Sequence, residues 1–172
     1  MIKYTRLAKN KDLSSIMEII EQAKQFLKQS GSTQWQSGYP NAKTIQNDLN
    51  NHNGLVFICN GTIAAYAAVI KGIEPSYINI DGAWQNNEDR YATIHRICFS
   101  AKFQGQGLAK LFLSNIITLE YANGIKNIRV DTHRLNKPMQ NVALHNGFKY
   151  RGIIKVDDEL DPERYAYELN LI

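Results

Sequence analysis

The sequence predicts a single α/β domain in which helices cover both faces of a mixed β-sheet. Three observations lead to this prediction: hydrophobic patterns typical of helices and of strands are interspersed, an Asn-Gly turn joins two strands, and a later strand–helix–strand segment has the length of a parallel crossover. The chain has 172 residues, enough for one domain with a sizeable core, and neither a linker nor a repeat divides it. We therefore expect residues 1–172 to form one domain.

The composition is that of an ordinary soluble protein, with 44% hydrophobic and 21% charged residues. The net charge of +4 is small and spread along the chain, so it permits an anionic ligand but does not argue for nucleic acid. No apolar run is long enough to span a membrane and the N-terminus has no apolar signal core, which favours a cytoplasmic protein. Cys59 and Cys98 lie in apolar runs, which favours burial, and no metal-ligand spacing is present, so no metal is expected.

The first half begins with a strand and two helices. Residues 2–8 predict the strand. Apolar residues spaced three and four apart predict a helix from a capping candidate, Asn10, to Gly31, because glycine suits the end of a helix. After a loop, Asn41 is expected to cap a shorter helix over residues 42–51.

A hairpin follows, with strands at 55–59 and 62–70 joined by Asn60-Gly61. Asn-Gly is the strongest short hairpin signal, because both central residues of that turn need a positive φ. A further short strand is expected at 77–80, and a polar loop at 82–90.

The second half alternates strands and helices before a closing pair of strands. The helix after the glycine-rich turn should end near Asn123-Gly124, and Asn136 should cap the next helix, with Pro138 in its first turn. The expected elements are strands at 91–99 and 127–132, helices at 108–119 and 136–146, and strands at 148–156 and 164–171.

A glycine-rich turn, Gln104-Gly105-Gln106-Gly107-Leu108-Ala109, lies between a strand and a helix. Such a turn leaves backbone N–H groups free at the positive end of the helix dipole, and glycine lets an anion approach closely, so the turn suits a phosphate. Neither the P-loop nor the Rossmann fingerprint fits, because no Lys-Ser or Lys-Thr follows Gly107 and Lys110 replaces the third glycine. A turn without a ligand is the alternative.

The pattern Q-x-x-G-x-[GA] at 104–109 resembles the acyl-CoA pyrophosphate loop of the GNAT superfamily of acetyltransferases. The order of elements resembles the GNAT fold over essentially the whole chain, and a second patch, residues 130–139 followed by Asn146-Gly147-Phe148, is similar to the other wall of the CoA cleft. His95-Arg96 and residues 35–40 also resemble a bacterial branch of the family. The resemblance implies a mostly antiparallel sheet in which two parallel strands splay apart.

The resemblance implies acetyl-CoA as co-substrate, with pantetheine between the splayed strands and pyrophosphate on the glycine-rich turn. Lys102 and Lys110 either add charge near the phosphates or are solvated. The CoA-binding residues implied are Ile97, Cys98, Phe99, Gln104, Gly105, Gln106, Gly107, Leu108, Ala109, Lys110 and Asn136.

Acetyl transfer to an amine benefits from a base, since a lysine-like ammonium has a pKa of about 10.4. The Glu that the family often uses falls on Thr93 here, which cannot serve as base. His95 matches a histidine that arylalkylamine acetyltransferases use on the same strand, and strand alternation predicts that Tyr91, Thr93, His95 and Ile97 share one face. His95 is therefore either a proton acceptor or a core histidine.

The usual acid of the family, a Tyr, falls on Ala143, which puts a dedicated acid in doubt. His133, just past the end of a strand, is a substitute acid or a substrate contact, and Tyr150 is a weaker candidate. His145 should face solvent.

Trp35, Tyr39 and Trp84 lie in loops, where they either line a pocket for an amine-bearing substrate or cover the core; Thr93 is a further substrate-binding candidate. The leading hypothesis is an acetyl-CoA-dependent N-acetyltransferase in which a primary amine attacks directly in a ternary complex. The acceptor remains open among small metabolites, polyamines, antibiotics and protein N-termini. The alternative is a CoA-binding sensor or interaction protein that has lost catalysis, and homodimers are common in the family.

Overall fold

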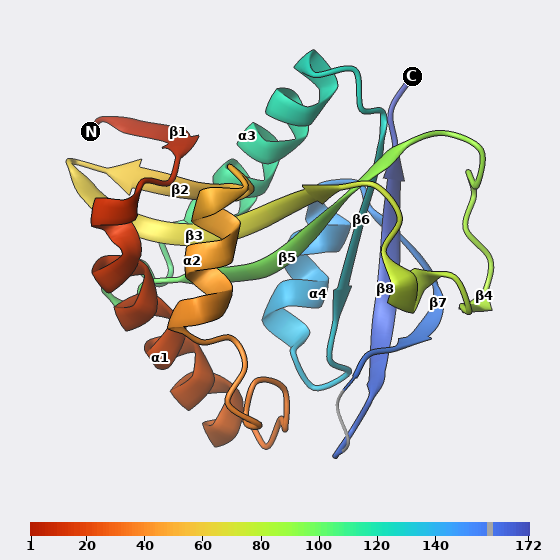
Figure 1. The fold of residues 1–172 in the computed structure, drawn as a ribbon, viewed down its shortest axis with the longest axis horizontal. Coiled ribbons are helices and arrows are strands. Elements are labelled where there is room, and N and C mark those ends of the chain that lie inside the picture. The colour runs from red at the N-terminus through yellow and green to blue at the C-terminus, as the bar shows by residue number, and fades with distance from the viewer. Residues whose placement is uncertain (158–159) are drawn as a thin grey trace.

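Eight strands form one sheet in the order β1-β2-β3-β5-β6-β8-β7-β4, as the computed structural model of residues 1–157 and 160–172 shows (Figure 1). All neighbouring strands are antiparallel except β5 and β6, so the predicted mixed sheet is confirmed. The strands are β1 (Lys3–Leu7), β2 (Gly54–Cys59), β3 (Thr62–Lys71), β4 (Asp81–Gly82), β5 (Tyr91–Phe99), β6 (Asn127–Thr132), β7 (Lys149–Lys155) and β8 (Glu163–Asn170).

Helices cover both faces of the sheet, as the sequence predicts. Ile16 and Ile45, from α1 and α2, pack with the residues on one face, and Phe112 and Met139, from α3 and α4, pack on the other. The α-helices are α1 (Leu13–Gln29), α2 (Ala42–Asn50), α3 (Leu108–Ala122) and α4 (Lys137–His145), and short 3-10 turns are η1 (Asn10–Asp12), η2 (Pro75–Tyr77) and η3 (Ala101–Phe103). Within the described residues no helix is long and apolar enough to cross a membrane.

The Asn60-Gly61 hairpin is confirmed, with φ of 48° and 82° at the two turn residues. The strand predicted at 77–80 is wrong. Pro75 opens the η2 turn instead, the Glu74 side chain accepts a hydrogen bond from the Ser76 N–H, and the short strand β4 follows at Asp81–Gly82.

Strands β5 and β6 form a fork. Their parallel pairing extends from Tyr91 opposite Asn127 to Ile94 opposite Val130. Beyond this point β5 continues beside β3 and β6 continues beside β8, so the two strands diverge (Figure 1). The splay implied by the GNAT resemblance is therefore present, and it leaves the facing edges of both strands unpaired.

A β-bulge in β5 changes which side chains share a face. Arg96 has a φ of +55°, and the register with β3 shifts between Tyr66 and Ala68. Ile97 consequently packs against the core under α3 and α4, on the side of Ile94. The prediction that Ile97 shares a face with Thr93 and His95 is wrong, because simple strand alternation does not allow for the extra residue.

Candidate active site

A cavity of about 990 Å³ lies at the fork between β5 and β6. Its walls include β5, the end of β6, residues 74–76, the glycine-rich turn, the starts of α3 and α4, the end of α1 and the loop that holds Trp35 and Tyr39. The fold therefore brings together segments from both halves of the chain around the diverging strands.

The glycine-rich turn forms one end of the cavity. Gly105 and Gly107 have φ of 73° and 69°, in the left-handed region, and a Cβ at either position would meet no atom within 4 Å. Gly107 is the N-cap of α3, and no described side chain caps this helix. The first N–H groups of α3 are thus open to an anion, at the positive end of the helix dipole.

Most of the residues expected to bind CoA line this cavity, and two do not. The lining includes Ile97, Cys98, Phe99, Gln104, Gly105, Gly107, Leu108, Ala109 and Asn136. Gln106 and Lys110 are exposed beside it, as is Lys102. Burial raises the pKa of the Cys98 thiol to about 12, so this cysteine stays protonated and unreactive.

His95 lines the cavity where the strands separate. Its Nε2 lies 3.1 Å from Glu74 Oε2, within ion-pair distance but without the alignment of a hydrogen bond. The contact with His95 lowers the pKa of Glu74 to about 2, so this carboxylate is ionised at neutral pH. Glu74 is held in place, since Tyr91 Oη accepts a 2.7 Å hydrogen bond from its N–H and Ser76 Oγ donates to Oε1 at 2.9 Å.

Asp131, on β6, is a second carboxylate at the fork and also lines the cavity. Its Oδ2 accepts a 2.8 Å hydrogen bond from the Tyr77 hydroxyl. Burial raises the pKa of Asp131, while the nearby His95 and the Tyr77 hydrogen bond oppose the shift.

Tyr39 and Trp35, both expected to bind substrate, also line the cavity. Arg96 donates to the Tyr39 hydroxyl at 2.5 Å and makes two bonds to Asp48, of 2.6 and 2.8 Å. The buried Tyr66 hydroxyl donates to the same carboxylate at 2.8 Å. The bulge at Arg96 thus directs a guanidinium that holds Tyr39 at the cavity wall.

Two of the three catalytic candidates lie outside the cavity. His133 is buried, with Nε2 2.9 Å from Asp161 Oδ2 and Nδ1 accepting from the Leu135 N–H, so both ring nitrogens are occupied. Tyr150 is half-exposed on β7 and packs edge-on against Tyr165 and Tyr167. The geometry gives neither residue access to a ligand in the cavity.

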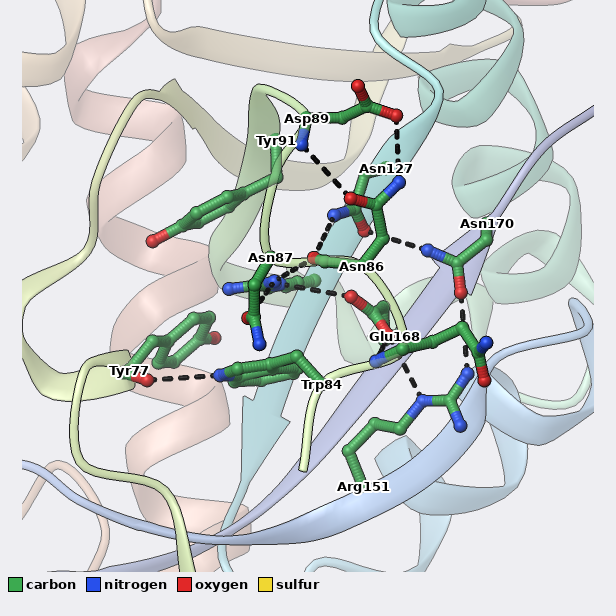
Figure 2. A network of polar contacts seen from close by, with 12 residues as sticks. Tyr77, Trp84, Asn86, Asn87, Asp89, Tyr91, Asn127, Arg151, Glu168 and Asn170 are labelled. Atoms are coloured by element: carbon green, nitrogen blue, oxygen red, sulfur yellow. Dashed lines mark hydrogen bonds and ion pairs between the residues drawn. The ribbon is translucent and has the colours of Figure 1, made fainter. Parts of the chain in front are cut away.

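Trp84 and Thr93, proposed as substrate contacts, also lie outside the cavity lining. Trp84 is buried and donates from Nε1 to the Tyr77 carbonyl, as Figure 2 shows. The Arg129 guanidinium lies 4.0 Å from the ring centroids of both Trp84 and Tyr91. Trp84 thus makes the expected cation–π contact, but with Arg129 of the protein and not with a substrate amine. Thr93 is buried in the sheet.

The family model of the acetyltransferase (GNAT) family matches residues 15–148. The chain belongs to this family. A GNAT acetyltransferase from Streptococcus agalactiae is 37% identical, with a TM-score of 0.90 over 99% of this chain and 96% of that one. A GNAT acetyltransferase from Listeria monocytogenes is 22% identical, with a TM-score of 0.75 over 98% and 95% of the two chains.

The PaiA N-acetyltransferase of Thermoplasma acidophilum, solved in complex with coenzyme A, has the same fold at 14% identity, with a TM-score of 0.73 over 99% of each chain. No curated protein matches the sequence. As a GNAT acetyltransferase, the protein is an acyltransferase enzyme.

Sequence reasoning missed Glu74, Asp131 and the pair of Asp48 with Arg96. Glu74 lies in a loop with no motif around it. Asp131 had a usable signal, because aligning the two parallel strands from their starts places it beside His95. The Asp48–Arg96 pair joins residues 48 positions apart, and nothing in the local sequence indicates that contact.

Proposed function

We propose that this GNAT acetyltransferase transfers an acetyl group from acetyl-CoA to a primary amine, which attacks the thioester directly in a ternary complex. The observation that carries the proposal is one cavity that joins an anion-binding turn to the ionisable groups at the fork. Phosphates and a reactive thioester belong to the two ends of one acyl-CoA molecule, and the cavity offers suitable chemistry at both ends.

The turn supplies N–H groups and the α3 dipole to the pyrophosphate, from Gly105 to Ala109. The unpaired edge of β5 beyond Ile94 supplies hydrogen-bonding groups to the pantetheine arm along Ile97 to Phe99. Asn136, the N-cap of α4, lines the same cavity.

His95 is our candidate for the proton acceptor. Its Nε2 lies 3.1 Å from Glu74 Oε2, so Nδ1 is the ring nitrogen left for the substrate, and Glu74 stabilises the imidazolium that forms. The amine nitrogen bonds to the carbonyl carbon, the C–S bond breaks, and a backbone N–H of β5 stabilises the oxyanion. A thiol pKa of about 8.5 makes the CoA thiolate an adequate leaving group without a dedicated acid, consistent with Ala143 in the core.

Release of CoA thiol across a panel of amines tests the proposal. The panel should include small amines, polyamines, aminoglycosides and peptides with free N-termini, because the proposal leaves the acceptor open among these classes. We expect thiol release that depends on at least one amine and requires acetyl-CoA. Tight CoA binding by calorimetry with no amine-dependent release would instead indicate the sensor hypothesis.

Asn136→Ala is expected to raise the KM for acetyl-CoA as well as to destabilise α4. Asn136 Oδ1 accepts a hydrogen bond from the Met139 N–H, and losing such a cap costs about 0.5–2 kcal/mol. The matched control is Asn41→Ala, which removes the cap of α2, a bond to Thr44 N–H, outside the cavity lining. Both variants should have a lower melting temperature than the wild type, and only Asn136→Ala should change the KM for acetyl-CoA. If both variants keep the wild-type KM, Asn136 serves only as a helix cap.

A further inference from the structure

The fork places His95 and Asp131 side by side. Ile94 and Val130 are the last paired residues of β5 and β6, so His95 and Asp131 are the next residue on each strand. Paired residues of parallel strands point to the same face, and successive residues alternate, so these two side chains leave the sheet on the same face. Both line the cavity, and Glu74 contacts His95 there.

The two oxygens of Asp131 have different surroundings. Oδ2 accepts the Tyr77 hydroxyl at 2.8 Å, while no described residue donates to Oδ1. Because the side chain lines the cavity, Oδ1 is the carboxylate oxygen available to a ligand. Glu74 is engaged by His95 and Ser76, so Asp131 carries the less satisfied of the two carboxylates.

A cluster of three aromatic rings, Tyr77, Trp84 and Tyr91, lies behind Asp131 and contacts it through the Tyr77 hydroxyl. Tyr77 is 1% exposed, and its ring lies 5.1 Å from Trp84 and 6.4 Å from Tyr91, centroid to centroid. Trp84 donates to the Tyr77 carbonyl, and Figure 2 shows this bond beside a wider polar network around Glu168. The Tyr91 hydroxyl accepts a hydrogen bond from the backbone N–H of Glu74, so the same cluster contacts both residues that carry the carboxylates.

We propose that Asp131 binds the amine of the acceptor through Oδ1 and holds its nitrogen beside His95, and that Tyr77 is the positioning residue of Asp131. This rests on the proposed acetyl transfer at the same site. One N–H of the bound amine donates to Oδ1, which fixes the direction of the attacking lone pair, while His95 takes the departing proton. Asp131 itself changes no covalent bond.

The negative charge of Asp131 is expected to lower the stability of the folded protein. Such a cost is consistent with a carboxylate whose role is to bind a ligand. The titratable and charged groups that interact with Asp131 include His95 on β5, Glu74 beside it, Tyr77 in η2, Arg164 on β8 and Tyr39 in the loop before α2. Burial raises the pKa of Asp131 by more than the favourable groups among these lower it. A raised carboxyl pKa means that the folded state holds its proton more tightly, so stability falls as pH rises from the ordinary Asp range through the folded pKa. Asp131→Asn should therefore melt above the wild type at pH 7, and the difference should shrink as pH falls toward that range.

The binding test uses n-butylamine as the probe, followed by NMR in the CoA-saturated protein. We expect the probe to shift the His95 ring signals in the wild type, to bind at least tenfold more weakly to Asp131→Asn, and to bind with intermediate affinity to Tyr77→Phe, which keeps the charge and loses the hydrogen bond. Asp81→Asn, which removes an exposed carboxylate outside the cavity, should bind as the wild type does. With an acceptor in hand, Asp131→Asn should raise the acceptor KM and leave the acetyl-CoA KM unchanged.

Two results would overturn the assignment: no probe binding to the wild type, or equal binding by the wild type and a folded Asp131→Asn. CoA calorimetry separates this failure from that of the proposed function. If CoA fails to bind at all, acetyl transfer is wrong, and the same probe titration without CoA still decides whether Asp131 binds an amine. If CoA binds and amines are acetylated while Asp131→Asn keeps its acceptor KM, only the role of Asp131 is wrong.

Discussion

Replacing Gly107 with Val is expected to reduce CoA affinity by about 10²-fold or more. Gly107 is the N-cap of α3 and has a φ of 69°, and its open side faces the cavity. A β-branched side chain there occupies the space in which the backbone would meet the pyrophosphate. Hydrogen bonds to charged groups contribute about 1.5–3 kcal/mol each, so the loss of two accounts for a reduction of this size. Isothermal titration calorimetry with CoA measures it directly.

The control for this variant is Gly124→Val. Gly124 follows the other end of α3, has a φ of 79°, and also has no atom within 4 Å of an added Cβ. Both substitutions place a residue with a side chain in the left-handed backbone region, which costs about 1–2 kcal/mol of stability. Both should therefore lower the melting temperature by a similar amount. Only Gly107→Val should lose CoA. A folded Gly107→Val protein that binds CoA normally would remove the main support for the proposed cofactor site.

The sequence predicted the order of elements because each long element has a clear local signal. The Asn60-Gly61 turn, the apolar period of α1 and the glycine turn before α3 all reflect residues that are close together in the chain. The strand expected at 77–80 failed because the deciding contact is distant: Tyr77 is buried against Trp84 and Tyr91, and its hydroxyl reaches Asp131.

The same distinction between local and distant contacts applies to the candidate site. The open helix N-terminus at the glycine-rich turn could be predicted, since the local backbone conformation alone creates it, and anion binding there stays a prediction. The role of individual polar side chains could not, because it depends on partners that only the fold supplies. His133 and Trp84 have side chains suited to a site, but other residues already engage them. His133 contacts Asp161, and Trp84 donates a hydrogen bond to Tyr77 and stacks on Arg129. Similarly, no glycine or proline in the sequence indicates the bulge at Arg96. The bulge nevertheless changes the face of the sheet on which the Ile97 side chain lies.

His95→Gln is expected to lower kcat/KM by about 10²-fold or more while CoA binding stays unchanged. General base catalysis contributes about 10²–10⁴-fold, and Gln keeps a polar group of similar length that does not take up the proton. Wild-type kcat/KM should rise with pH as the general base loses its proton, and the variant should lack this rising limb. His145→Gln, an exposed histidine outside the cavity, is the control and should behave as the wild type.

Glu74→Gln separates catalysis by His95 from a packing role. The ionised Glu74, whose pKa is lowered to about 2 by His95, favours the charged imidazole in return. Removing that charge should reduce the rate at the plateau of the pH–rate profile, because the imidazolium formed during proton transfer loses its partner. If His95 has only a structural role, Glu74→Gln should leave the plateau rate unchanged. If His95→Gln retains near-normal rates with the wild-type profile, the amine loses its proton to bulk water, and the Glu74–His95 pair serves only to close the fork.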